Sequence, residues 1–114
     1  ELAAAPAGES SAAIRARVIA ARRRQERRFA DCPGVHCNAQ MAAKHIREFV
    51  QLDADAHTAL ETALDRLGLS ARAYERVLKV ALTLADLDGV DRITRAHIAE
   101  AISYRNLDRS SWGE

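Results

Sequence analysis

The segment from Gly68 to Leu87 constrains the fold most, because its apolar residues recur with the 3.6-residue period of an α-helix. Ser70 is suited to cap the helix start, and Leu69 and Tyr74 are spaced to pack across it as a hydrophobic staple. The apolar stripe consists of Tyr74, Val77, Leu78, Ala81, Leu82 and Ala85. Such a stripe needs another element to cover it, so this segment predicts a helix packed on one face.

Further stretches follow the same period, and we expect helices over residues 10–29, 41–50, 54–67 and 95–105. Asp53 and Thr94 are expected to cap the starts of the last two helices, and residues 86–92 are expected to form a turn. No stretch alternates with period two, and aromatic residues make up only 4% of the chain, too few for a β-sandwich or barrel. The sequence therefore predicts an all-α fold, a small bundle of four to five helices.

A chain of 114 residues is long enough for one domain with one modest core. Residues 1–9 are predicted to be a linker, residues 10–105 the helical domain and residues 106–114 a flexible polar tail. The chain begins at Glu1 rather than at a methionine, so we interpret it as a fragment of a longer protein. No apolar run reaches the length of a membrane span, and we expect a cytoplasmic protein without a membrane partner.

Positive charge is concentrated in the first predicted helix. Seven arginines and one glutamate lie between Ser10 and Ala30, a net charge of +6, so the remaining residues carry −5 in a chain of net +1. Phosphate contacts need only positioned positive charge, but the helix lacks the aromatic residues that stack on single strands. The candidates for contacts with DNA or with another subunit are Arg22, Arg23, Arg24, Arg27 and Arg28. A solvated face, or one docked on the acidic remainder of the chain, is the alternative.

Cys32 and Cys37 flank a short loop that also contains His36. These three side chains fall short of the four ligands of a structural zinc site, so no metal site is predicted. A disulfide across the loop is sterically possible, although reduced thiols are expected in a cytoplasmic protein. The sequence contains no phosphate-binding loop, no HExxH pair and no Ser–His–Asp set, so we do not expect this chain alone to be an enzyme.

Arg72 is an unusual residue for a helix start. With Ser70 as the cap it takes the second helical position, where the free N–H groups are already positive and a cation costs about 0.3–1 kcal/mol. The arginine is explained if the helix N-terminus and the forked guanidinium converge on a phosphate. A simply solvated arginine is the alternative, and Arg95 occupies a similar first turn, so the local pattern leaves both interpretations open.

Three stretches together resemble a known family: ARRRQERRF at 21–29, CNAQM at 37–41 and LGLSARAYERVLKVALTLADLDGVDRITRAHIAEAISYR at 67–105. They are similar to the C-terminal helical lid domain of the Mg-chelatase-like AAA+ ATPases, the ComM/YifB competence-protein family. The resemblance extends from about Glu9 to Arg109. It implies a lid that follows an AAA+ core in the same chain, within a homo-hexamer. ATP and Mg²⁺ would then be cofactors of the full-length protein, with neither bound by this chain alone.

The resemblance also implies roles for individual residues. The family carries a sensor-2 arginine near the start of a lid helix, and the matching residue here is Arg72, which is expected to contact ATP at a subunit interface. Arg22, Gln25 and Arg28 match the family pattern ARxxQxxR, which indicates a structural or interface role. The parent protein is expected to be an ATPase that processes DNA in competence or branch migration. The alternatives are a stand-alone DNA-binding helical module and the lid of a magnesium chelatase subunit that inserts Mg into a porphyrin.

Overall fold

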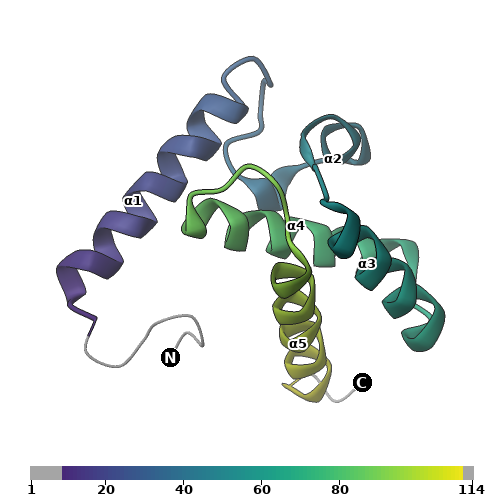
Figure 1. Cartoon of the computed structure of the whole chain (residues 1–114). Coiled ribbons are helices and arrows are strands. Elements are labelled where there is room, and N and C mark those ends of the chain that lie inside the picture. Colours follow the sequence, from purple (N-terminus) through teal and green to yellow (C-terminus); the bar gives the residue numbers. More distant parts are fainter. Residues whose placement is uncertain (1–8, 112–114) are drawn as a thin grey trace.

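Helix α4 (Ala71–Asp88) lies at the centre of the bundle and touches most of the other elements (Figure 1). The computed structural model describes residues 9–111, with side chains through residue 104. Helix α4 packs against α1 (Ser11–Arg28), the 3₁₀ turn η1 (Asn38–Gln40), α2 (Ala43–Phe49) and α5 (Arg95–Ser111), and α3 (Ala54–Leu67) packs against α5. The described residues contain no β-strand, so the predicted all-α class is confirmed.

The starts of α3 and α4 follow the predicted local signals, and other helix ends have local causes of the same kind. The side chains of Ser10, Asp53 and Ser70 each accept a hydrogen bond from the backbone N–H three residues later, at 3.1, 2.8 and 3.1 Å. Helices α3 and α4 end at Gly68 and Gly89, whose φ angles of 58° and 73° lie in the left-handed region that favours glycine. These starts and stops are therefore set by residues next to the helix ends.

Helices α4 and α5 are longer than the sequence predicts. Helix α4 includes residues 86–88, which the sequence assigns to a turn, and its last turn is partly buried. Helix α5 continues to Ser111, whereas the sequence predicts a flexible tail from residue 106. Residues 1–8 of the predicted linker and residues 112–114 of the predicted tail lie outside the described residues.

The start of α5 differs in detail from the predicted threonine cap. The Thr94 N–H donates a hydrogen bond to Nδ1 of His97 at 3.0 Å, and the Thr94 hydroxyl lies 3.1 Å from the same nitrogen. The histidine side chain therefore satisfies the backbone at this helix start. Nε2 of His97 lies 2.6 Å from Oδ2 of Asp88, so one buried ring joins the end of α4 to the start of α5.

A short backbone bridge sets the position of α3 relative to α5. Leu52 and Ile93 form an isolated parallel bridge. The Ile93 N–H donates to the carbonyl oxygen of Gln51 at 2.8 Å, and the Asp53 N–H donates to the carbonyl oxygen of Ile93 at 3.1 Å. Because α3 and α5 each begin directly after this bridge, the two helices start side by side and their apolar faces pack on each other.

The core follows the predicted stripe of α4 and is mostly aliphatic, with Phe29 and Met41 also buried in it. Val77, Leu78, Ala81, Leu82 and Ala85 are all buried, and Tyr74 is half-buried at the edge of the same cluster. Residues from α3 and α5 belong to the same cluster: Ala56, Leu60, Ile98 and Ala101. Leu67 is 41% exposed, because α3 ends there, one turn beyond its last buried residue.

Replacing Leu78 by alanine is expected to lower the free energy of unfolding by about 2–5 kcal/mol, as for other buried leucines. Only 2% of Leu78 is exposed. Leu67→Ala is the matched control, because it removes the same atoms from an exposed site and is expected to change stability by about 0.5 kcal/mol. Urea denaturation of both variants measures the difference. Equal midpoints would show that the inward face of α4 is not the main core surface.

Candidate functional site

Arg72 lies where the sequence places it, at the second position of α4, and its side chain is exposed. The first turn of the helix contains no acidic residue, and Arg72 forms no ion pair with a described residue. The Ser70 hydroxyl accepts from the Ala73 N–H, while the other first-turn N–H groups have no partner within the helix. A guanidinium beside the positive end of an 18-residue helix favours an anion with several oxygens, such as a phosphate.

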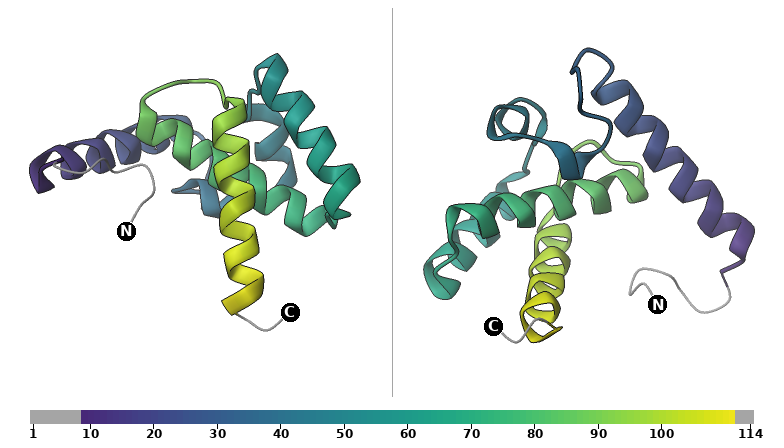
Figure 2. Two further views of the ribbon diagram at one scale, coloured as in Figure 1. Left: turned by 60° about the horizontal axis from the view of Figure 1, so that its bottom comes forward. Right: turned by 180° about the vertical axis from the view of Figure 1, so that it is seen from behind.

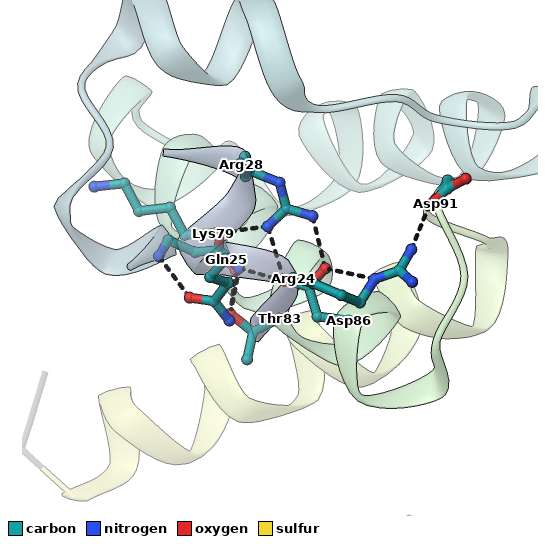
Figure 3. Close-up of polar contacts among 8 residues, drawn as sticks. Arg24, Gln25, Arg28, Lys79, Thr83, Asp86 and Asp91 are labelled. Atoms are coloured by element: carbon teal, nitrogen blue, oxygen red, sulfur yellow. Dashed lines mark hydrogen bonds and ion pairs between the residues drawn. The ribbon is translucent and has the colours of Figure 1, made fainter. Parts of the chain in front are cut away.

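Two of the candidate arginines of α1 point toward the buried carboxylate of Asp86 on α4 (Figure 3). Nη1 and Nη2 of Arg28 donate to the two carboxylate oxygens at 2.9 and 2.7 Å, which makes a bidentate pair. Nε of Arg24 lies 3.7 Å from Oδ1 of Asp86, and Nη2 of Arg24 pairs with Asp91. The side chain of Asp86 has 0% exposure, so these two cations offset the cost of burying its charge.

The turn η1 joins the same contacts through Asn38, which is also buried. Its Nδ2 donates to Oδ2 of Asp86 at 2.9 Å and to Oγ1 of Thr83 at 3.0 Å. Its Oδ1 accepts from Nη1 of Arg28 at 2.9 Å, and its backbone N–H donates to Oε1 of Gln25 at 3.0 Å. We call these residues the Asp86 network: Arg24, Gln25, Arg28, Asn38, Thr83 and Asp86.

The Asp86 network holds α1 and η1 on the C-terminal half of α4, whereas Arg72 lies at the opposite end of that helix. Gln25 and Arg28, which match the family pattern, are thus placed in buried polar contacts between helices. Arg22, Arg23 and Arg27 are exposed and form no ion pair with a residue that the structure describes. The contact with DNA or another subunit therefore stays a prediction, and only these three candidates have free guanidinium groups.

Neither Asp86 nor Asn38 is among the residues that the sequence singles out. The sequence does indicate that Asp86 is buried. It lies four residues after Leu82 and eight after Leu78, on the same face as the apolar stripe. An acidic residue on a buried face requires a partner. Arg24 and Arg28 are one helical turn apart and could have been matched to it.

The two cysteines lie in the loop between α1 and η1. Cys32 and Cys37 are free and partly exposed. Among the described residues, no three His, Cys, Asp or Glu side chains gather closely enough to hold a metal ion. None of the helices between residues 9 and 111 is both long and apolar enough to cross a bilayer.

The sequence of this chain is similar to one family model and to known bacterial proteins. The family model described as magnesium chelatase, subunit ChlI C-terminal, matches residues 8–105. The chain is 48% identical over 102 residues to the protein YifB of Escherichia coli and 41% identical over 102 residues to the competence protein ComM of Haemophilus influenzae. Each alignment covers 90% of this chain and 19% of the relative, so the chain spans about a fifth of the length of these curated relatives. No solved structure matches the chain.

Proposed function

Because the chain belongs to the family of magnesium chelatase subunit ChlI C-terminal domains, we propose that it is the helical lid of a larger Mg-chelatase-like AAA+ ATPase. In this proposal the AAA+ core lies in the same polypeptide, and Arg72 is the sensor-2 arginine that contacts ATP at a subunit interface of a homo-hexamer. The observation that carries the proposal is the exposed Arg72 guanidinium, free of described ion pairs, at the positive end of α4.

The proposed mechanism follows from the contacts that hold α4 in the bundle. ATP would supply the phosphoryl group, which passes to water with ADP as the leaving group, and the Arg72 guanidinium would stabilise the negative charge that develops on the phosphoryl oxygens. Val77, Leu78 and Leu82 are buried further along the same helix, and the Asp86 network fixes its last turns. A shift of Arg72 toward or away from the nucleotide therefore moves the bundle as a rigid body and reports the nucleotide state to the neighbouring subunit.

The parent protein in this proposal is a cytoplasmic motor that processes DNA during competence or branch migration. The name of one relative, competence protein ComM, supports this assignment. Replacement of Arg72 in the intact protein tests the nucleotide contact, and the size of its effect is argued in the Discussion.

The 114-residue chain alone is expected not to hydrolyse ATP, because its sequence contains no phosphate-binding loop. Phosphate release from ATP with Mg²⁺ measures this, with the Arg72→Ala chain purified in the same way as a control for contaminating ATPases. Turnover that co-purifies with the wild-type chain and is lost in the Arg72→Ala chain would contradict the assignment as a lid.

A stand-alone DNA-binding module is the second candidate, favoured by the exposure of Arg22, Arg23 and Arg27. Three phosphate contacts would make the logarithm of the affinity for duplex DNA fall with the logarithm of salt concentration with a slope of about −3. Replacing the three arginines together by alanine should then abolish binding. Replacing the exposed arginines Arg15, Arg66 and Arg95 together changes the net charge equally and should weaken binding much less. Absence of binding at low salt would exclude the module.

The lid of a true magnesium chelatase subunit is the third candidate, and the description of the family model favours it. The two motors differ in what stimulates ATP turnover in the intact protein. Stimulation by duplex or branched DNA supports the DNA-processing parent. ATP-dependent insertion of Mg²⁺ into a porphyrin, with partner subunits present, supports the chelatase.

A further inference from the structure

Only part of helix α1 is covered by the rest of the bundle. Ala21 and Gln25 are buried and Arg28 is held by Asp86, but none of residues 11–20 is buried. Figure 2 shows this end of α1 extending away from the other helices. Since helices in proteins are stabilised mainly by packing of an apolar face, this end of α1 is a surface on which a further element can pack.

A shallow groove runs along the uncovered side of α1, beside the turn at Gly89 that ends α4. Its volume is about 450 Å³, and we call it the α1 groove. Ala16, Ile19 and Ala20 supply its apolar lining, and Ile19 is 42% exposed. An exposed isoleucine between small alanines forms a surface that another helix can approach closely, because little side-chain bulk separates the two backbones.

Two unpaired cations continue this groove. Arg23 and Arg27 line it, lie one helical turn apart and are exposed, and neither forms an ion pair with residues 9–104. Arg24 also lines the groove, but its guanidinium already meets Asp86 and Asp91. The available positive charge therefore consists of two guanidiniums, whose Cβ atoms are about 5–6 Å apart along the helix.

We propose that the α1 groove docks an acidic amphipathic helix from the remaining part of the same polypeptide. Aliphatic side chains of that helix cover Ile19, and carboxylates one turn apart pair with Arg23 and Arg27. This inference uses the part of the proposed function that places the chain in a longer protein, but it does not use Arg72. Because the chain spans about a fifth of the length of its relatives, most of such a polypeptide is available as a partner, at high effective concentration.

The chemistry of the groove favours a protein over a nucleic acid. A duplex backbone would pair with the two arginines but would leave the apolar lining around Ile19 uncovered. Exposed Glu26 lies in the same helical turn as Arg23 and Arg27 and would repel phosphates. Arginine next to aliphatic surface is typical of protein interfaces, where charge pairs fix the register and the apolar contact is desolvated.

Backbone hydrogen exchange tests the docking without an activity assay. Amides of residues 11–20 are expected to exchange about tenfold or more slowly in the full-length protein than in the 114-residue chain, because docking suppresses local opening of α1. Arg23→Glu with Arg27→Glu in the full-length protein should restore the fast exchange of the short chain. Arg15→Glu with Arg22→Glu is the control, with the same charge reversal outside the groove, and should keep the protection.

Dilution and the addition of duplex DNA decide the partner. Protection that is unchanged when the protein is diluted until it is monomeric supports docking within one polypeptide, whereas protection lost on dilution assigns the groove to a second copy and overturns the proposal. Protection that appears only after duplex DNA is added, or that is absent throughout, also overturns it.

Arg72→Ala should leave the protection intact, so a failed nucleotide contact and a failed docking site are told apart. Equal urea midpoints of the 114-residue variants confirm that the reversals do not unfold the chain.

Discussion

Arg72→Ala is expected to lower the ATP turnover of the intact protein by about 10²-fold or more, the size of effect seen when one preorganised charge-stabilising donor is removed. The fold should survive, because Arg72 is exposed and makes no ion pair with the part of the chain that the structure describes. Removing a cation from a helix start should leave the free energy of unfolding unchanged or raise it by about 0.3–1 kcal/mol. The two measurements together separate loss of nucleotide contact from loss of structure.

Arg95→Ala is the matched control for this experiment. Arg95 is also exposed in the first turn of a helix, but it lies on α5 and has no counterpart in the family motif. Its replacement should leave ATP turnover unchanged. If Arg72→Ala and the wild type turn over ATP at equal rates, Arg72 is a solvated arginine and the proposed sensor-2 role is wrong.

The starts of α3 and α4 were predictable from sequence because their causes are local. A serine or aspartate side chain reaches only to the backbone a few residues away, as Ser70 does, and a left-handed glycine ends the helix that it follows. The inward face of α4 was predictable for a related reason, since the period of its apolar residues defines one face of the helix. These features supply enough information for the all-α class and for the position of Arg72.

The Asp86 network was not predicted because it depends on contacts between distant segments. Arg28 and Asp86 are 58 positions apart, and Asn38 lies 48 positions before Asp86. Their pairing requires α1 to cross the last turns of α4 in one register, which no local pattern encodes. The assignment of residues 86–92 to a turn also hid the burial of Asp86, because polar residues near a glycine look like a loop.

The same difference between local causes and long-range contacts explains why the sequence could not separate the roles of the candidate arginines. Composition correctly located an excess of positive charge in α1, but it could not separate arginines that neutralise a buried carboxylate from arginines that face solvent. Arg27 and Arg28 are neighbours in sequence, yet Arg27 is exposed and Arg28 is bonded to a side chain with no exposed surface. The helix rotation that separates them is fixed by the burial of Ala21 and Gln25 on the inner face of α1 and of Phe29 directly after it.

Arg28→Ala is expected to lower the free energy of unfolding by about 3–5 kcal/mol, because it leaves the buried Asp86 carboxylate without its bidentate partner. Asn38 would still donate one hydrogen bond, but Arg24 is 3.7 Å away and already pairs with Asp91. For a domain whose total stability is about 5–15 kcal/mol, this loss is a large fraction. With urea m-values of about 1–3 kcal/mol per molar, the unfolding midpoint should fall by about 1 M or more.

Arg27→Ala is the control that differs by one position. It removes the same charge from the same helix, but from an exposed side chain, and should change stability by about 0.5 kcal/mol or less. Removing both charges of the pair, with Arg28→Met and Asp86→Leu together, should recover most of the loss, because no buried charge is then left without a partner. Equal midpoints for Arg27→Ala and Arg28→Ala would mean that the Arg28–Asp86 pair does not hold α1 on α4. If the double replacement is as unstable as Arg28→Ala alone, the loss comes from packing in this region, and the unpaired charge is not its cause.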